Sequence, residues 1–264
     1  MPVSNGDPVM TPPEVCPADY VTVAVSTLGA GLLHLRLPDP CAGITYLILV
    51  QQPQAGAAEV FANRSDVRVV LLGGIGLSNS RNAALDQAET ALLLFADDDM
   101  ILDLQGIQTL AECFKTDPQL ALAAGWRTER LPAKAEQVTL TRFNSGRICA
   151  PEFMVRRAAV QAAQIRFDPD FGLGAHHGLG EDYVFVTDLL RAGLTGISVP
   201  VATGSHPHAS TGGNWVDPKL NPARQAVLTR VFGRMAPLIR LVYALRHRKR
   251  LGGLGAVIRF IWLA

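Results

Sequence analysis

The chain of 264 residues has few cysteines, few aromatic residues and no long apolar run. The cysteines are too few and too widely spaced for a disulfide framework or a zinc knuckle: Cys16, Cys41, Cys113 and Cys149. No uninterrupted apolar run approaches the roughly 20 residues that a membrane-spanning helix needs. Residues 1–19 lack the apolar segment of a secretory signal, so we expect a protein of the reducing cytoplasm.

The overall composition is that of a folded protein. Hydrophobic residues make up 48% of the chain, charged residues 18% and aromatic residues 6%. These proportions exclude a disordered chain, a collagen-like repeat and a coiled coil. The length allows one large α/β domain or two small ones, with enough chain to bury a sizeable core.

Acidic residues are absent after Asp217, although ten lysines and arginines follow it. The whole chain has a net charge of +1, so the first 217 residues carry +1 minus +10, or −9. This asymmetry indicates that residues 219–264 contact an anionic surface, either a membrane or a nucleic acid. Nucleic acid is disfavoured because aromatic residues are not interleaved with the charges. The alternative is that these basic helices cover the core of the protein itself.

The first half of the chain predicts strands that alternate with helices. Short apolar runs rich in β-branched residues predict buried strands at 20–26, 44–50, 67–72 and 91–96. The segments between and after these runs predict helices at 57–63, 80–89 and 103–115. Such alternation indicates an α/β protein with a mostly parallel, doubly wound central sheet flanked by helices.

The second half is less regular. Residues 136–160 predict one strand or a strand pair followed by a short helix. A helix at 181–192 ends at Gly193, and a strand follows at 197–202. Basic helices begin near residue 221.

Three consecutive aspartates, Asp97, Asp98 and Asp99, follow the apolar run at 91–96. The carboxyl edge of an α/β sheet is where such proteins bind ligands. Adjacent carboxylates repel one another unless a cation neutralises them, and a divalent metal ion shared with phosphate oxygens is a suitable partner. Strand alternation predicts that Asp97 and Asp99 point the same way and Asp98 the other way. The alternative is a turn in which one aspartate caps a helix.

A second segment, residues 76–82, combines a glycine, serines and asparagines with Arg81 ahead of an alanine-rich helix. The glycine would let the backbone approach a phosphate, and the helix N-terminus favours anions. Ser78 and Arg81 are therefore candidate contacts to a bound anion. A capped helix after a turn has the same pattern, and the segment matches neither a Walker loop nor a Rossmann fingerprint.

Two further groups of residues carry acid–base or metal-binding potential. Glu181 and Asp182 open a predicted helix after a glycine-rich loop, where they are either catalytic carboxylates or favourable charges at a helix start. His206 and His208 lie close together beside hydroxyl residues, which suggests a metal or phosphate contact. No cysteine and histidine set completes a zinc site.

Taken in order, these segments resemble the inverting family 2 glycosyltransferases, which have the GT-A fold. The resemblance covers residues 20–215 and is carried by segments 21–27, 76–82, 92–99, 167–172 and 180–182. Residues 206–212 also resemble the loop that closes the site in a bacterial branch of that family. The sequence departs from the pattern after the second strand, where Gln51-Gln52-Pro53 replaces the usual acidic pair.

The resemblance implies a nucleotide-diphosphate sugar donor, most often UDP-linked, together with Mn²⁺ or Mg²⁺. It places Ser26 and Thr27 in the nucleotide pocket, puts Gln52 in place of an acidic uracil contact, and adds Ser78, Arg81, Asp97 and Asp98 to the donor contacts. The candidate metal ligands are Asp99 and Asp97, with His206 or His208 completing the coordination. Asp182 is the expected general base, with Glu181 as its rival.

The resemblance also implies an organisation and a role. Residues 1–19 would be an irregular lead-in, 20–217 the catalytic domain and 218–264 a basic helical extension. Within the domain, 20–99 would bind the nucleotide and 100–217 the acceptor. The acceptor would be a hydroxyl of a glycan or of a lipid-linked acceptor in surface polysaccharide synthesis, in the cytoplasm or on the inner face of the membrane.

Two other functions are compatible with carboxylates at a sheet edge. A sugar-phosphate nucleotidyltransferase would also bring carboxylates, metal and nucleotide together, but it needs a basic glycine loop near the N-terminus, and residues 29–34 contain no lysine or arginine. The other alternative is a non-catalytic subunit that binds a sugar nucleotide. Intact acidic residues at 97–99 and 181–182 disfavour it. The sequence gives no indication of oligomeric state.

Overall fold

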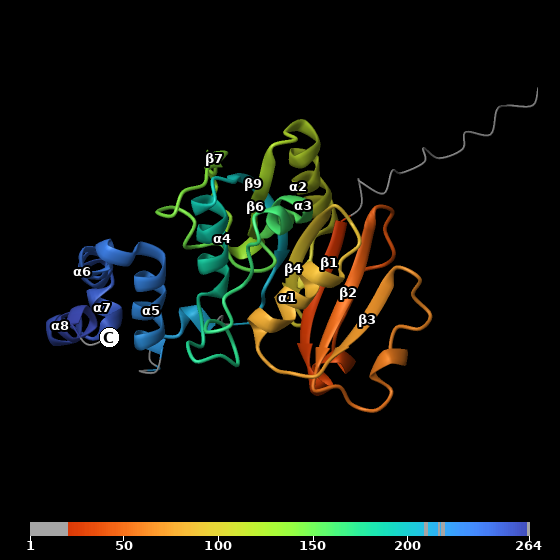
Figure 1. Ribbon diagram of the computed structural model, residues 1–264, viewed down its shortest axis with the longest axis horizontal. Helices are drawn as coiled ribbons and strands as arrows, with labels where there is room; N and C mark the ends of the chain where they lie inside the picture. The colour runs from red at the N-terminus through yellow and green to blue at the C-terminus, as the bar shows by residue number, and fades with distance from the viewer. Residues whose placement is uncertain (1–20, 209–210, 216, 218–219, 263–264) are drawn as a thin grey trace, which may run out of the picture.

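The computed structural model describes residues 21–208, 211–215, 217 and 220–262. The predicted lead-in at 1–19 and Lys219 lie outside the described residues. Within the described part of the chain, nine strands form one sheet in the order β3-β2-β1-β4-β8-β6-β9-β5, and β7 pairs with β9. Helices flank this sheet, as Figure 1 shows. The predicted α/β class is confirmed.

The first half of the sheet is parallel. It comprises β1 (Val21–Leu28), β2 (Ile44–Gln51), β3 (Val67–Leu72) and β4 (Leu92–Asp97). β1 lies between β2 and β4, and β2 pairs with β3. β1, β2 and β4 are buried almost throughout, which is why their sequences are continuous apolar runs rather than alternating ones.

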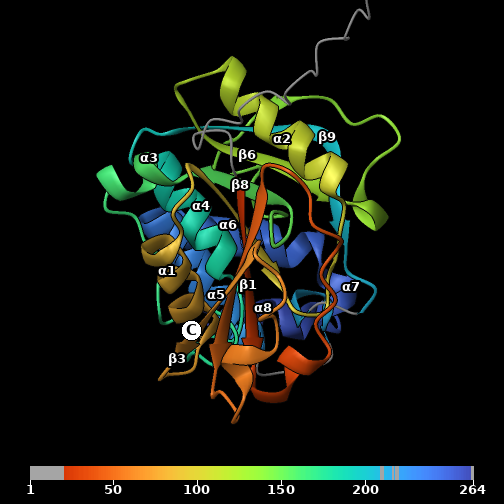
Figure 2. The same ribbon diagram turned by 90° about the vertical axis from the view of Figure 1, so that its right-hand side faces the viewer.

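Helices pack on both halves of the sheet. The helix α1 (Leu77–Gln87) packs against β1 and β2, and α2 (Leu104–Thr116) packs against β6 and β9. In Figure 2, α1 lies to the left of β1 and α2 lies near the top. Two short 3₁₀ helices, η2 (Gly29–Leu33) and η3 (Ala57–Glu59), occupy connections after β1 and β2. Asp103 caps α2 through a hydrogen bond from the Gly106 N–H to its carboxylate at 3.0 Å.

The second half of the sheet is mixed. Its elements are β5 (Ile101–Leu102), β6 (Leu120–Arg127), η4 (Thr128–Arg130), β7 (Val138–Thr139), β8 (Phe153–Arg156), α3 (Arg157–Ala162), α4 (Glu181–Arg191) and β9 (Thr195–Ser205). β8 runs antiparallel to both β4 and β6. Consequently β4 and β6 run in the same direction, and their carboxyl ends meet at the same edge of the sheet.

A cluster of four phenylalanines joins this edge to α4. Phe95 of β4 lies 5.3 Å from Phe153 and 5.1 Å from Phe167, measured between ring centroids. Phe167 and Phe185 of α4 stack at 3.9 Å. All four rings are fully buried, so their packing fixes α4 and the loop before it against the end of β4.

The C-terminal helices extend the molecule at the end opposite β3, as Figure 1 shows. They are α5 (Leu220–Phe232), η6 (Gly233–Met235), α6 (Ala236–Arg246), α7 (Arg248–Leu251) and α8 (Leu254–Trp262). A second apolar cluster joins Phe171 and Val184 of the body to Val227 and Val231 of α5. The expectation that basic helices cover the core therefore holds for α5, whereas α6 and α8 pack on α5. Among the described residues, no helix has the length and apolar character required to cross a membrane.

Candidate active site

The three aspartates at the end of β4 have three different partners. Asp97 accepts a hydrogen bond from Arg81 at 3.1 Å, Asp98 accepts one from the Thr27 hydroxyl at 2.5 Å, and Asp99 lies 3.1 Å from His206 Nε2. Because β4 ends at Asp97, strand alternation does not set the directions of Asp98 and Asp99. Burial raises the pKa of Asp98, and the Thr27 hydrogen bond opposes that rise.

Arg81 connects this edge to the start of α4. Its side chain extends from α1 and the residue is only 1% exposed. The guanidinium donates to Asp97 at 3.1 Å, to Glu181 at 3.1 Å and to Asp182 at close range. Burial lowers the pKa of Arg81, but Asp182, Asp97 and Glu181 outweigh it and the net shift is upward. One permanent positive charge therefore serves three carboxylates.

Asp182 is the carboxylate most affected by this imbalance. Burial raises its pKa to about 8; Arg81 opposes the rise, and the charges of Glu181 and Asp97 add to it. Its second oxygen accepts a hydrogen bond from the Ala150 N–H at 3.3 Å. The pKa of Asp182 is therefore raised above that of an ordinary aspartate, so its carboxylate binds a proton more tightly.

The predicted nucleotide residues lie at the ends of β1 and β2. Ser26 and Thr27 are buried, and the Ser26 hydroxyl lies 2.7 Å from that of Ser80. Gln52, directly after β2, is exposed and has a φ of +48°. Ser26, Thr27 and Asp98 therefore form one edge, while Gln52 lies beyond it.

Gly31 was not singled out by the sequence, yet it fits tightly against this edge. A Cβ atom at Gly31 would lie 2.4 Å from Asp98 Oδ2 and 2.7 Å from the Thr27 hydroxyl. Only glycine lets the η2 backbone come so close to the Thr27–Asp98 hydrogen bond. The glycines at 29 and 31 directly after the first strand were the available signal.

Ser78 and Arg81 are placed differently from their predicted role as anion contacts. Ser78 is fully buried, and its hydroxyl donates to the Phe171 carbonyl at 2.6 Å. It thereby ties α1 to the loop before α4 and does not face the aspartate edge. Arg81 has protein carboxylates as its partners, so its guanidinium is not open to a bound nucleotide. The segment does begin a helix, although no side chain caps it, and the anions that Arg81 contacts are carboxylates of the protein itself.

His206 and Asp99 form a pair of atoms that can hold a cation. The His206 Nδ1 atom lies 2.6 Å from the His208 carbonyl oxygen, so it carries the proton and donates it. In the neutral ring, Nε2 then presents a lone pair to the Asp99 carboxylate, and two acceptors at this distance require a proton or a metal ion between them. The side chain of His208 is exposed, with its ring centroid 6.2 Å from that of His206.

The pair does not extend to a larger set. No three His, Cys, Asp or Glu side chains in the described ranges have an arrangement that would hold a metal ion. Asp97 accepts a hydrogen bond from Arg81, and His208 contacts His206 through its backbone carbonyl. Of the four predicted metal ligands, the structure brings only Asp99 and His206 together.

Trp215 anchors the loop that carries His206, and the sequence analysis did not single it out. Its ring lies 4.9 Å from His247 and 6.0 Å from Tyr243, with the Arg224 guanidinium 4.2 Å above it. Trp215 itself is therefore held by side chains of the C-terminal helices. A lone tryptophan in a polar, glycine-containing segment was the available signal.

No protein-family model matches the chain, and no curated protein matches it. Solved structures do. S. aureus TarS 1–349 in complex with UDP-GlcNAc has a TM-score of 0.59 at 14% identity over 92% of this chain and 81% of that one. The mannosyltransferase PcManGT from Pyrobaculum calidifontis, in complex with GDP-Man and Mn²⁺, has a TM-score of 0.58 at 15% identity over 95% and 77%.

A third similar structure is glucosyl-3-phosphoglycerate synthase from Mycobacterium tuberculosis with Mg²⁺ and UDP. Its TM-score is 0.53 at 15% identity, over 81% of this chain and 79% of that one. Against a longer TarS chain, the protein spans 43% of that chain's length. At these identities the likeness concerns the fold. The chain has a GT-A-like fold, the fold of glycosyltransferases that use nucleotide sugars.

The raised pKa of Asp182 predicts a pH-dependent stability. Neutral Asp182 stabilises the fold fully below its unfolded pKa of about 3.9, and this contribution is lost as the pH rises through its folded pKa of about 8. The wild type should therefore lose stability between pH 5 and pH 9, whereas Asp182→Asn should not. We expect the unfolding free energy of the variant, relative to that of the wild type, to rise by at least about 1 kcal/mol over this range. Urea titrations at each pH measure this difference. An identical pH dependence in the two proteins would contradict the shift, and Asp86→Asn, on the surface, is the control.

Proposed function

We propose that the protein is a metal-dependent, inverting glycosyltransferase of family 2 that transfers a sugar from a nucleotide-diphosphate sugar, UDP-linked in most such enzymes, to an acceptor hydroxyl. The acceptor is a glycan or a lipid-linked molecule of surface polysaccharide synthesis. Residues 20–99 bind the nucleotide, 100–217 the acceptor, and 218–264 form the basic extension. The fold, the aspartate edge and the solved structures with UDP-GlcNAc, GDP-Man and UDP support this proposal.

One observation carries the proposal: the Arg81 guanidinium bonds both the donor edge and the candidate base. Asp97 and the pair Glu181–Asp182 come from segments about 85 residues apart, yet they share one buried cation. A structural salt bridge needs one carboxylate. Three around one arginine leave a surplus of negative charge, which fits a site built to meet a cation and to accept a proton.

The chemistry then follows from the positions of these groups. The acceptor oxygen attacks the anomeric carbon while its proton passes to an oxygen of Asp182, and the bond from that carbon to the diphosphate breaks. A base must be ionised to accept this proton, so the raised pKa of Asp182 predicts that activity increases as the pH rises toward about 8. A single base without a second carboxylate as nucleophile gives inversion. Thr27, Asp98 and Ser26 line the donor edge.

Asp99 and His206 would hold the metal ion, because their facing oxygen and nitrogen atoms suit Mn²⁺ and, less well, Mg²⁺. Two protein ligands leave further positions for the diphosphate oxygens. When bound, the ion neutralises the charge of the leaving diphosphate without moving a proton.

Product analysis separates this proposal from the two alternatives. A nucleotidyltransferase releases pyrophosphate, whereas a glycosyltransferase releases a nucleoside diphosphate when acceptor is present. A non-catalytic subunit releases neither. The loop at Gly29–Leu33, which packs on Asp98 and carries no basic side chain, disfavours the nucleotidyltransferase.

We also propose that the C-terminal helices dock on an anionic membrane surface. On α6, apolar side chains at helical spacing are exposed to solvent: Leu238, Leu241, Val242 and Leu245. On α8, Leu254 and Ile258 are exposed by 70% and 61%. An amphipathic helix with such an apolar stripe lies in the headgroup region of a bilayer.

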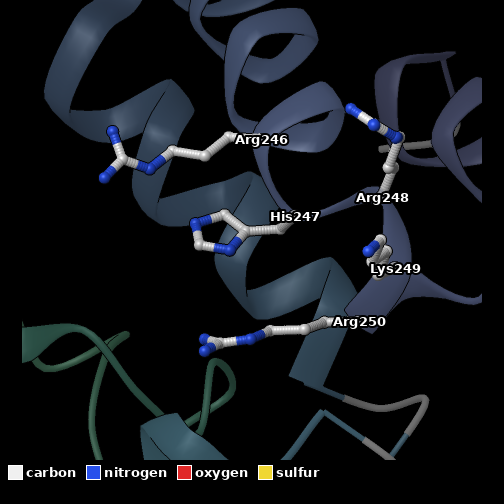
Figure 3. A pocket seen from close by; sticks show the side chains of 5 residues that line it. All are labelled: Arg246, His247, Arg248, Lys249 and Arg250. Carbon is white, nitrogen blue, oxygen red and sulfur yellow. The ribbon is translucent and has the colours of Figure 1, made fainter.

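Basic residues accompany this stripe. Residues 246–250 line a shallow pocket of about 250 Å³. In Figure 3, Arg246, His247 and Arg250 extend to one side, and Arg248 and Lys249 leave the backbone on the other. No acidic residue occurs after Asp217, so this end attracts anionic lipid by about 1 kcal/mol for each cation near the surface.

Asp182→Asn tests the base. We expect turnover to fall by at least about a hundredfold, since general-base catalysis contributes that much, while the Kd of the donor stays within about threefold. Release of nucleoside diphosphate measures turnover, and calorimetry measures donor binding. Glu181→Gln is the matched variant; normal turnover in Asp182→Asn together with loss in Glu181→Gln would transfer the role to Glu181.

Asp99→Ala tests the metal pair. In the wild type, we expect UDP with Mn²⁺ to raise the melting temperature more than UDP alone, because ligand binding stabilises the folded state. In Asp99→Ala this additional shift should disappear. Asp86→Ala, which removes an exposed carboxylate paired with Arg166, is the control. An unchanged Mn²⁺ effect in Asp99→Ala would rule out the metal assignment.

The double variant Val242→Glu/Ile258→Glu tests membrane docking. We expect the wild type to float with vesicles containing anionic lipid and not with neutral vesicles, and the variant to lose about 80% or more of that binding. Leu71→Glu, at a β3 residue that is 47% exposed, is the matched control because it adds a charge far from the extension. Equal flotation of the variant and the control would refute the docking surface.

A further inference from the structure

Three arginines converge on one buried carboxylate beside the candidate active site. Arg127 ends β6, Arg130 lies in η4, and Arg147 precedes β8. Their nitrogens lie 3.4, 3.4 and 3.7 Å from the carboxylate oxygens of Glu152, which is fully buried. We call these three arginines the arginine cluster.

Glu152 neither neutralises the charge of the arginine cluster nor accepts hydrogen bonds from all of its donors. Its carboxylate accepts hydrogen bonds from the backbone N–H groups of Arg127 and Cys149, both at 3.2 Å. The contacts to the guanidinium groups are longer than the roughly 2.7–2.9 Å of a charge-assisted hydrogen bond. The Arg127 Nε–H is buried and finds no hydrogen-bond acceptor among the described residues. Even with Glu129, 3.6 Å from Arg127, the group retains positive charge.

The arginine cluster lies between the candidate base and the His206 loop. Arg130 donates to Cys149 Sγ at 3.3 Å, and the next residue, Ala150, donates its N–H to Asp182 at 3.3 Å. On the other side, the His206 N–H contacts Glu129 at 3.4 Å. An anion held here would therefore lie close to the oxygen that receives the acceptor's proton.

Access to the arginine cluster comes through its two outer members. The side chains of Arg130 and Arg147 are 32% and 20% exposed. Arg147 is fixed, since it stacks on Trp126 at 3.3 Å and donates to the Gly125 carbonyl at 3.2 Å. Besides the 3.4 Å contact with Glu152, Arg130 donates to the Arg147 carbonyl and to Cys149 Sγ. A guanidinium has five N–H donors, so it can also bind a phosphate.

We propose that the arginine cluster binds a phosphate group of the acceptor, next to the hydroxyl that receives the sugar. Guanidinium groups match phosphate oxygens in geometry as well as charge. The acceptor is then a phosphorylated polyol or sugar rather than a neutral glycan. This inference rests on the proposed function. The donor diphosphate is the other source of phosphate, but it belongs at the Asp98–Asp99 edge, whereas the arginine cluster adjoins Asp182.

The test compares glycerol 3-phosphate with glycerol, which carry the same hydroxyl chemistry with and without a phosphate. Calorimetry measures their binding to protein saturated with UDP and Mg²⁺. We expect the wild type to bind only glycerol 3-phosphate, Arg130→Gln to bind it about tenfold more weakly or worse, and Arg130→Lys to fall between them. Arg166→Gln, a substitution of an exposed arginine outside the arginine cluster, should leave the Kd of glycerol 3-phosphate unchanged. Melting curves verify that each variant folds.

Three results would overturn the inference. If the wild type binds UDP but does not prefer glycerol 3-phosphate, the phosphate subsite is wrong and the proposed function stands. If Arg130→Gln weakens UDP binding instead, the arginine cluster serves the donor. If Arg130→Gln binds glycerol 3-phosphate as the wild type does, the arginines only neutralise Glu152. Failure of the wild type to bind any nucleotide would refute the proposed function itself.

Discussion

The rest of the site depends on the ion pairs that the buried guanidinium of Arg81 makes with three carboxylates. This guanidinium holds carboxylates of β4 and α4 that are separated by about 85 residues and would otherwise repel one another in a medium of low dielectric constant. Its position in turn requires α1 to be placed so that the Arg81 side chain reaches both elements. The Ser78–Phe171 hydrogen bond and the stack of Phe167 on Phe185 secure that placement.

The edge of the sheet carries opposite charges at neighbouring strand ends. The end of β4 presents three aspartates, and the end of β6 presents Arg127 with Arg130 just beyond it. The antiparallel strand β8 makes this possible, because it separates two strands that run in the same direction. On the proposed function, the aspartates at the end of β4 would attract the metal ion bound to the donor. The arginines at and beyond the end of β6 would attract the phosphate of the acceptor.

Local sequence patterns predicted most of the sheet and part of the site. The run at 67–72 has the observed bounds of β3, but the predicted burial is wrong, because β3 is at the edge of the sheet and pairs only with β2. The helix expected from 80 begins at Leu77, because Gly76 makes no side-chain capping bond that could mark the start. The strands β5 and β7 have two residues each and exist only through pairing with β9, which no local pattern encodes.

The individual carboxylates could be identified from the sequence, but their partners could not. A motif with serine and arginine at a helix start looks the same whether the anion is a phosphate or a protein carboxylate, so Ser78 and Arg81 were assigned to the nucleotide. The convergence of Arg127, Arg130 and Arg147 on Glu152 had no sequence signal, because these residues carry no motif spacing and meet only through the chain reversals around β8.

The contacts of the Trp215 ring with His247 and Tyr243 have a consequence for the design of truncated variants. Removing α6 to α8 would take away the rings of Tyr243 and His247 that contact this tryptophan, which follows His206 by nine residues in the chain. If the proposed function holds, we expect a truncated protein to lose activity even on a water-soluble acceptor. Such a loss would reflect the missing contacts of Trp215 as readily as a lost membrane contact, so only point substitutions on the exposed face of α6 and α8 can distinguish the two.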